Sequence, residues 1–434
     1  MNIKTFIFDI AGFGLANFLS KGAHLLVVPL LTHNLLPGDF GELELIVGFG
    51  VIISVFVSLS LESYIARQWG VTNDTAIHAK LLSSTMFLSA IVAILLVIAS
   101  LLLQNFLSQA LFSTDSYAVA ISSIVLYGVF LALLSLILIA LRMQRNLKWY
   151  LILVTVQSSL YLCAVFYLNY HENITVESII QTMLLSVTLT LILALYNARR
   201  YLFMGFDSQL IQKALRYSLP LLPAVAITWV NSQVDKYALL YFIDIKTVGE
   251  FALVAKLTAF LTLAVTVFRQ AWLPYCFRLA KLPNYGLSTF RKVMNIYFGI
   301  GLALCLVLVL LAKPIFTLLA IPEYELELSV LPILLLATIV YGSASVGNVG
   351  TLISGKTEWN SYAALMGMVV NISLTCLLVP LLEVKGAAWG TLLANAVFVS
   401  VLLWRTARKL KIYFQLELIF AMVCVYFLCS AVIL

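Results

Sequence analysis

Three apolar stretches of the sequence carry polar side chains at helical spacing. In the first, Asn17, Lys21 and His24 occupy positions i, i+4 and i+7, so they share one face of a helix. A charge in the middle of a membrane costs at least about 2.5–3.5 kcal/mol on insertion scales, so such a side chain usually faces a polar cavity or a partner. Lys21 lies about 20 Å along its helix, too far from the end for its ammonium group to reach the interface easily. We therefore predict that Lys21 lines a functional cavity.

The other two stretches carry similar stripes. Their residues are Thr228, Asn231, Ser232 and Asp235, followed by Lys236, in one, and Thr258, Thr262, Thr266 and Arg269, with Lys256 to the side, in the other. The buried cations outnumber the buried anions, and lysine and arginine form charge-assisted hydrogen bonds that a low dielectric strengthens. The pattern predicts an aqueous cleft shared by the stripes and an anionic ligand group, such as a phosphate or a carboxylate.

Three of these cations have a structural alternative. Arg269 and Lys256 lie close enough to the ends of their stretches to extend to the membrane surface. Lys236 can neutralise Asp235 as a purely structural pair. The sequence leaves these alternatives open.

Composition identifies the elements that must hold these residues. Hydrophobic residues make up 63% of the 434 positions, charged residues 10%, and the mean hydropathy is +1.06. A soluble domain cannot bury that much apolar surface, and runs that are long and continuously apolar predict spanning helices rather than barrel strands. The predicted spans are roughly 8–33, 40–66, 81–104, 117–141, 149–170, 177–198, 217–242, 249–275, 293–318, 326–354, 360–382 and 386–404, with 412–434 as an additional transmembrane helix or a surface helix. We expect bends at Pro29, Pro223 and Pro274, because proline interrupts the helical hydrogen bonds.

The basic residues between the spans predict the orientation of the chain. Nineteen lysines and arginines fall at the N-terminus and in the even-numbered gaps, whereas the odd-numbered gaps hold only Lys246, Lys313 and Lys385. Basic loops remain in the cytoplasm, so the N-terminus is predicted to be cytoplasmic.

A short repeat divides the chain into two halves. Gly41-Glu42 opens the second predicted span and Gly249-Glu250 opens the eighth, with six spans between the two copies. An even number of spans gives repeats of the same orientation, which is one transporter architecture. We predict six-helix bundles at 1–200 and 201–411, joined by an amphipathic segment at 199–216 that lies on the inner surface.

Several motifs, taken in order, resemble a known family. They are Tyr217-Ser218-Leu219-Pro220-Leu221-Leu222-Pro223, Asn231, Asp235-Lys236-Tyr237, Val248-Gly249-Glu250-Phe251, Trp272-Leu273-Pro274, Ser354-Gly355-Lys356-Thr357, Asn371 and Lys385-Gly386-Ala387-Ala388-Trp389-Gly390-Thr391. This arrangement resembles the O-antigen (Wzx-type) polysaccharide flippases. They belong to the multidrug/oligosaccharidyl-lipid/polysaccharide (MOP) superfamily, with the multidrug and toxic compound exporters (MATE) and the lipid II flippase.

The resemblance implies a fold and an activity. The fold would be an all-α integral membrane protein with two six-helix bundles in a V-shaped MATE/MOP-like arrangement, and 412–434 would depart from the usual twelve spans. The activity would be translocation of an undecaprenyl-pyrophosphate-linked oligosaccharide, an O-antigen or related repeat unit, across the bacterial inner membrane by alternating access. Lys21 and Arg269 match basic cavity residues of such flippases and would bind the pyrophosphate. Asn17, Asn231 and Asp235 would bind sugar or a coupled H+ or Na+, and His24, Lys236 and Lys256 complete the set of candidates.

The same resemblance bears on partners and alternatives. Membrane lipid, a polysaccharide polymerase and chain-length proteins are the expected partners, and neither nucleic acid nor a cofactor is expected. A cation-coupled multidrug exporter of the same fold is one alternative, and a membrane polysaccharide polymerase or ligase is another. We expect no enzyme, because every outer gap is short and no acid–base pair or metal-ligand cluster is visible. No GxxxxGK[ST] motif is present, so ATP hydrolysis by that route is not expected.

Overall fold

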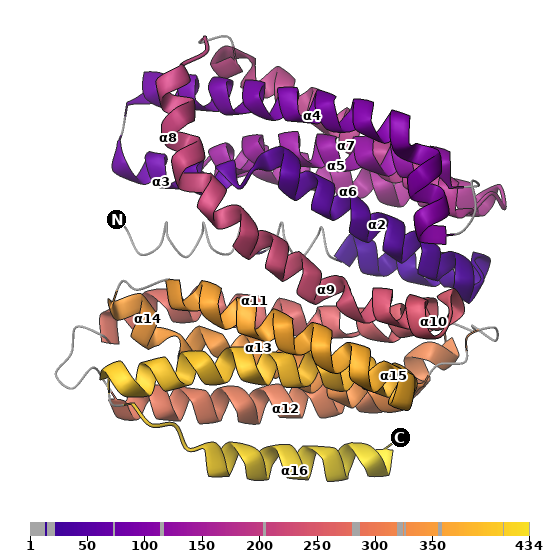
Figure 1. The fold of residues 1–434 in the computed structure, drawn as a ribbon, viewed down its shortest axis with the longest axis vertical. Helices are drawn as coiled ribbons and strands as arrows, with labels where there is room; N and C mark the ends of the chain where they lie inside the picture. Colours follow the sequence, from indigo (N-terminus) through magenta and orange to yellow (C-terminus); the bar gives the residue numbers. More distant parts are fainter. Residues whose placement is uncertain are drawn as a thin grey trace. The chain divides into compact units, whose positions relative to one another are not determined.

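The computed structural model of the chain describes residues 14, 22–72, 74–112, 117–202, 205–279, 287–318, 324, 327–354, 358–410 and 412–433. All secondary structure in these ranges is helical (Figure 1). A helix satisfies its backbone N–H and C=O groups within one segment, which is what a long apolar run in lipid requires. The prediction of an all-α chain is confirmed for these ranges. Asn17 and Lys21 lie outside the described residues.

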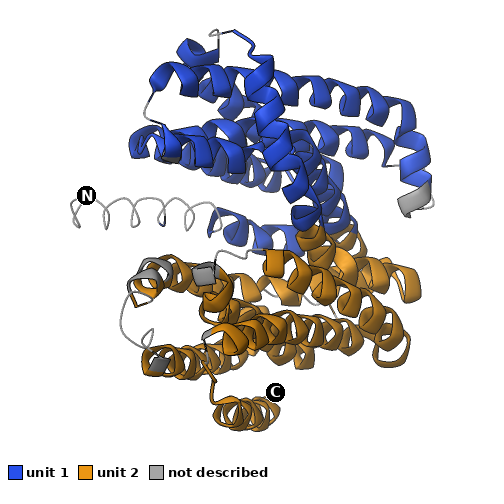
Figure 2. Cartoon of the chain, turned by 60° about the vertical axis from the view of Figure 1, so that its left-hand side comes forward, with its two compact units in different colours: residues 1–35, 42–226 blue, residues 36–41, 227–434 orange. Residues whose placement is uncertain are grey.

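The contacts divide the chain into two compact units. Unit 1 comprises residues 1–35 and 42–226, and unit 2 comprises residues 36–41 and 227–434 (Figure 2). After a helical segment at residues 22–34, the helices are α2 (Pro37–Ser58), α3 (Leu61–Val71), α4 (Thr75–Phe112), α5 (Ala118–Met143), α6 (Leu147–Tyr170), α7 (Val176–Leu202), α8 (Ser208–Ser218), α9 (Leu222–Phe242), α10 (Ile245–Lys256), α11 (Thr258–Leu279), α12 (Leu287–Leu318), α13 (Leu331–Gly347), α14 (Val349–Ser354), α15 (Glu358–Leu410) and α16 (Leu416–Ile433), with 3₁₀ turns η1 (Leu219–Leu221) and η3 (Leu328–Val330). The halves 1–200 and 201–411 were defined by the sequence repeat rather than by contacts, so they stay a prediction.

Unit 1 is organised around α5. This helix packs against α4 and α7 and also contacts α3 and α6, and it buries Ile124, Leu134 and Leu136 completely. A Cβ atom on Gly128 of α5 would lie 2.4 Å from the carbonyl oxygen of Gly50 in α2, so these two backbones meet without intervening side chains. Such small-residue contacts are a common way to pack helices in a membrane. The hydrophobic effect does not drive helices together there, because lipid tails are as apolar as the side chains, and close van der Waals packing takes its place.

The segment 199–216 was predicted to be amphipathic and to lie on the inner surface. In the structure its residues 199–202 end α7 and its residues 208–216 belong to α8. The Asp207 carboxylate caps it by accepting hydrogen bonds from the N–H groups of Gln209 and Leu210. The helix packs against α3 and α4, with Ile211 and Ala214 on its buried face.

Unit 2 is organised around α13, which packs against α15, α11 and α12. Helix α15 contains a break at Glu383, where φ is 50°, so it consists of two helical segments that meet at this residue. Helix α16 packs against α12, and the Tyr426 hydroxyl donates a 2.9 Å hydrogen bond to the carbonyl oxygen of Pro332 in α13.

Nine helices among the described residues are long and apolar enough to cross a membrane, or ten if the bent pair α10–α11 is one span. One of the nine is α15, which carries both predicted spans 360–382 and 386–404, and another is α16. Helix α9 is not among them, because Asn231, Asp235 and Lys236 lower its hydropathy. At 21 residues and about 1.5 Å per residue it is nevertheless long enough to span.

The largest break in the predicted eighth span lies away from its proline. Helices α10 and α11 meet at Leu257 with a bend of 41°. The Thr258 hydroxyl donates a 2.6 Å hydrogen bond to the carbonyl of Ala255, and threonine back-bonding of this kind bends helices. Near the predicted bend at Pro223, the 3₁₀ turn η1 with Pro220 precedes α9.

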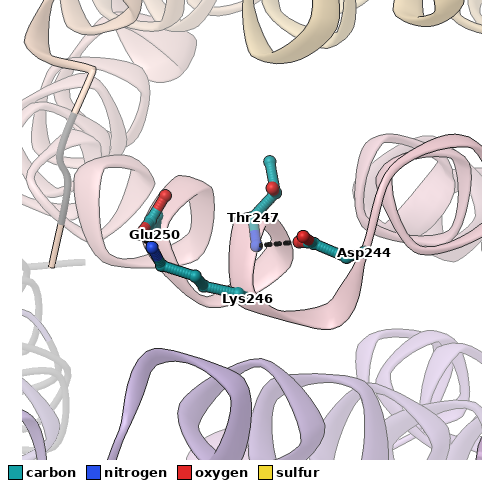
Figure 3. Close-up of polar contacts among 4 residues, drawn as sticks. All are labelled: Asp244, Lys246, Thr247 and Glu250. Carbon is teal, nitrogen blue, oxygen red and sulfur yellow. Dashed lines mark hydrogen bonds and ion pairs between the residues drawn. The ribbon is translucent and has the colours of Figure 1, made fainter. Parts of the chain in front are cut away.

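Two glycines of the sequence repeat meet within unit 2. The first turn of α10 is capped by Asp244, whose carboxylate accepts a 2.7 Å hydrogen bond from the N–H of Thr247, while Lys246 lies 3.7 Å from Glu250 (Figure 3). One residue before Glu250, a Cβ atom on Gly249 would lie 1.9 Å from the carbonyl oxygen of Pro37. A Cβ atom on Gly41 would lie 2.4 Å from the carbonyl oxygen of Ile245. The repeat therefore has a structural role, because only glycine lets these two helix starts approach so closely.

We predict that Gly249→Ala destabilises the protein. The added methyl group collides with backbone on the opposite side, which cannot rotate away, and overpacking of this kind costs about 1–3 kcal/mol. The apparent unfolding temperature in detergent should fall by several degrees. Gly299→Ala in α12 is the matched control, because its Cβ atom would meet no atom within 4 Å. Equal unfolding temperatures for the two variants would contradict the prediction.

Candidate functional site

The first candidate residue that the structure describes is His24. It is exposed, and its ring centroid lies 5.0 Å from that of Tyr161 in α6. Both residues belong to unit 1. Because the His24 side chain is exposed, its imidazole ring can contact a polar group outside its own helix while it packs against Tyr161.

Asp235 is the most deeply buried charged candidate in the described part of the chain. Its side chain in α9 is 8% exposed, and Oδ2 accepts a 2.6 Å hydrogen bond from the hydroxyl of Thr391 in the second segment of α15. Among the described residues, Oδ1 accepts no hydrogen bond. Lys236 follows in sequence, is half-buried, and interacts electrostatically with Asp235. One oxygen of a buried carboxylate thus remains available for a ligand or a proton.

Asn231, one turn before Asp235, joins the same group. The side-chain amide of Asn371 in the first segment of α15 donates to the backbone oxygen of Asn231 at 3.3 Å and to its side-chain oxygen at 3.4 Å. The Thr375 hydroxyl donates a 3.1 Å hydrogen bond to the Asn371 side-chain oxygen. The five residues Asn231, Asp235, Asn371, Thr375 and Thr391 form what we call the oxygen cluster of unit 2.

A glycine allows the oxygen cluster to form. A Cβ atom on Gly390 would lie 2.2 Å from the hydroxyl oxygen of Thr375, so the two segments of α15 approach closely at this point. The sequence stripe identified Asn231 and Asp235 but not their partners. Asn371 and Thr391 were visible only as parts of family motifs, and Thr375 was missed although it stands four residues after Asn371, on the same helical face.

The chemistry of the oxygen cluster suits a small cation. It offers one carboxylate together with amide and hydroxyl oxygens, and hard cations bind to oxygen ligands of these types. Transition metals more often use several His, Cys, Asp or Glu side chains, and no group of three or more such residues that could hold a metal occurs in the described ranges.

Lys256 and Arg269 occupy other parts of unit 2. Lys256 is half-buried at the break between α10 and α11, and its ammonium nitrogen lies 5.5 Å from the ring centroid of Phe40. Arg269 is exposed on α11. The threonines between them, Thr262 and Thr266, donate to the carbonyl oxygens of Thr258 and Thr262, so their hydrogen atoms are used within the helix.

The face of α11 beside Arg269 lines an apolar groove. The groove has a volume of about 460 Å³ and lies among α11, α12 and α13, with Phe268, Trp272, Tyr297 and Ile339 in its walls. The polar atoms of two of these aromatic residues are satisfied, because Trp272 donates to Ser345 O at 3.1 Å and Tyr297 donates to Ile339 O at 3.0 Å. The groove therefore presents apolar surface, one position away in sequence from an exposed guanidinium group.

Proteins of known structure share this fold. A multidrug resistance MATE family transporter of the MOP superfamily, in an inward-facing conformation, is 17% identical over 90% of this chain and 95% of its own, with a TM-score of 0.68. The lipid II flippase MurJ, in an inward closed conformation, is 15% identical over 97% and 91% of the two chains, with a TM-score of 0.72. A MOP superfamily transporter from Pyrococcus furiosus, described as having a binding pocket of reverse polarity, is 15% identical over 93% and 96%, with a TM-score of 0.60. The predicted MATE/MOP-like fold is thus confirmed.

Comparison at the level of sequence gives the family. No curated protein matches the chain at a significant level. The model of the family described as polysaccharide biosynthesis protein matches residues 9–280, more than half of the 434 residues. With this match and with helices suited to a membrane along most of its length, the chain is a multi-pass membrane protein that belongs to the polysaccharide biosynthesis protein family and has the MOP superfamily fold.

Proposed function

We propose that the protein is a flippase that moves an undecaprenyl-pyrophosphate-linked oligosaccharide, such as an O-antigen repeat unit, from the inner to the outer leaflet of a bacterial inner membrane. The N-terminus is cytoplasmic in this proposal, no bond is made or broken, and the polymerase and chain-length proteins act on the product. Family membership and the likeness to a lipid II flippase support the class of cargo.

The single observation that carries the proposal is the pairing of charge and groove on α11. Arg269 is exposed on the same helical turn as Phe268 and Trp272, which line the apolar groove. A lipid-linked oligosaccharide combines an anionic pyrophosphate with a long apolar tail, and guanidinium binds phosphate oxygens in a bidentate fashion. In the proposed mechanism Arg269 and Lys21 hold the pyrophosphate and the groove receives part of the tail. The remaining candidates, Asn17, His24, Lys236 and Lys256, would contact the headgroup or the sugars.

The second candidate function is export of a cationic drug coupled to a cation. The buried carboxylate of Asp235 favours it, because an organic cation needs an anion in its path. The two functions differ in the charge of the cargo. Replacing a cationic cavity residue by an anionic one should therefore abolish transport of an anionic headgroup but not export of a cation.

We predict that Arg269→Ala slows flipping about tenfold or more. Hydrogen bonds to a charged group contribute about 1.5–3 kcal/mol, which corresponds to roughly ten- to hundredfold. The measurement uses proteoliposomes that contain a fluorescent undecaprenyl-pyrophosphate oligosaccharide and records the label that becomes protected from dithionite. Arg269→Lys should retain most of the rate, and Lys313→Ala, an exposed cation on α12, is the matched control. A normal rate for Arg269→Ala would remove Arg269 from the headgroup path.

Charge reversal at Lys21 should separate the two candidate functions. In a strain that lacks this gene and has no second flippase, wild type should restore surface polysaccharide, whereas well-expressed Lys21→Glu should not. An exporter of cations would keep its activity in Lys21→Glu cells, measured as efflux of a cationic dye. Surface polysaccharide that survives deletion of the gene would overturn the flippase proposal.

The oxygen cluster of unit 2 is proposed to bind the coupling ion, H+ or Na+. Asp235→Asn removes its charge and Thr391→Val removes the hydroxyl that lies 2.6 Å from the carboxylate. We predict that Asp235→Asn abolishes stimulation of flipping by an imposed gradient and that Thr391→Val weakens it several-fold. Separate gradients, Na+ at constant pH and pH in choline chloride, identify the ion.

Thr338→Val in α13 is the matched control for this experiment, since the Thr338 hydroxyl bonds only to the carbonyl of Leu334 among the described residues. If Asp235→Asn responds to both gradients as wild type does, the oxygen cluster has a purely structural role.

A further inference from the structure

A second polar site lies in unit 1, at a break in a predicted span. The sequence predicts one helix over 40–66, but α2 ends at Ser58 and α3 begins at Leu61. Leu59 and Ser60 between them have φ angles of 48° and 56°, in the left-handed region that residues other than glycine rarely adopt. Such strain persists where the surrounding structure enforces it and is concentrated at functional sites. A broken helix also frees backbone carbonyl groups, which transporters use to coordinate cations.

The break lines a pocket of about 300 Å³, which we call the serine pocket. Its polar side chains are Ser54, Ser58, Ser60, Glu62, Ser63 and Ser135. The rest of the lining is aliphatic, so every polar side-chain atom of the pocket is an oxygen, and no aromatic ring, amide or basic group takes part. Among the described residues, Glu62 forms no ion pair with a lysine or arginine.

The hydrogen bonds within the pocket leave mainly acceptors exposed to it. Ser54 donates to Val51 O at 2.7 Å and Ser58 donates to Val55 O at 3.2 Å, so both hydroxyl hydrogens are used within α2. Ser135 has one hydrogen but two acceptors in reach, Glu62 Oε1 at 2.7 Å and Ala132 O at 2.8 Å. Hydroxyl groups whose hydrogens are engaged in this way present lone pairs, which bind cations.

Ser60 provides a separate indication of a ligand. Its side chain is 5% exposed and lines the pocket, yet its hydroxyl has no hydrogen-bond partner within the described part of the chain. A buried polar atom without a partner costs folding free energy, and a ligand in the pocket would remove that cost.

We propose that the serine pocket binds a small monovalent cation of the alkali series, held by the Glu62 carboxylate and the hydroxyl oxygens of Ser60 and Ser135. The single carboxylate balances a single positive charge and repels anions, and Ca2+ sites in proteins draw on more oxygen ligands and charge than it supplies. The pocket has room for several water molecules as well as an ion, so the ion keeps part of its water shell. The pocket lies in unit 1 and the oxygen cluster in unit 2, so this site is separate from the one proposed for coupling.

The experiment measures cation binding in the Asp235→Asn background, where the oxygen cluster lacks its charge. The full-length protein is purified in choline chloride, and binding of 22Na+ is measured by scintillation proximity, with K+ and Li+ as competitors at constant ionic strength. We expect about one Na+ per protein. Adding Glu62→Gln should weaken binding tenfold or more, whereas Ser122→Ala in α5, whose hydroxyl bonds to Val119 O at 2.9 Å, should leave it unchanged.

Ser60→Ala gives a second readout that does not depend on tight binding or on Glu62→Gln folding well. In choline this variant should be as stable as its parent or more so, because it removes a buried oxygen without a partner. In Na+ its increase in unfolding temperature should be smaller than that of the parent. Three results would overturn the proposal. The first is an increase in unfolding temperature on adding Na+ that is equal for Ser60→Ala and its parent. The others are an unchanged affinity for Na+ when Glu62→Gln is added, and the absence of Na+ binding in Asp235→Asn.

Discussion

The burial of the Asp235 carboxylate is the constraint on which much of unit 2 depends. A carboxylate in the membrane costs several kcal/mol unless neighbouring groups solvate it, and α9 alone supplies only Asn231 and Lys236 nearby. Thr391 and Asn371 come from the two segments of α15, so both segments must lie beside α9. That packing requires the left-handed residue at Glu383, which turns α15, and the glycine at position 390, which lets its segments meet. The solvation of this carboxylate and of its neighbour Asn231 therefore depends on both segments of a helix of 53 residues.

Glycine contacts perform a comparable task elsewhere. Gly50 and Gly128 bring α2 and α5 together in unit 1, and Gly41 and Gly249 bring two helix starts together in unit 2. A Cβ atom on Gly128, Gly41 or Gly249 would meet backbone first, so no rearrangement of side chains could accommodate a larger residue there. The sequence analysis took the Gly-Glu repeat as a sign of two halves. The structure gives its glycines a second role, because they allow two helices to pack closely.

The sequence predicted uninterrupted helices well and interrupted ones poorly. The predicted spans 117–141, 149–170 and 177–198 agree with α5, α6 and α7 to within a few residues, because continuous apolar runs determine helices in lipid. The break after Ser58 and the bend at Leu257 involve no proline. They depend on tertiary packing and on hydroxyl groups that bond to their own helix, which a hydropathy pattern does not register. The polar stripe on α9 was visible in the sequence. Its partners Asn371, Thr375 and Thr391 are scattered on largely apolar spans, and their role became clear only when the structure placed them beside α9.

The distribution of charge suggests how a transporter of an anionic lipid can use cations. In the proposed function Arg269 on α11, with Lys256 on α10, would attract an anion, whereas the oxygen cluster and the serine pocket each offer a single carboxylate among neutral oxygens and would attract a cation. These groups lie on different helices, so an anionic headgroup and a cation can be bound at the same time, without competing for one site. Simultaneous binding is what electrostatic coupling needs, because each bound charge then changes the free energy of the other. A flippase in which carboxylates and cations formed saturated ion pairs with one another would lose this coupling. A coupled carrier would therefore be expected to keep two features. One is the Asp235 oxygen that accepts no hydrogen bond among the described residues. The other is the Glu62 carboxylate, which accepts its hydrogen bond from a serine rather than from a described lysine or arginine.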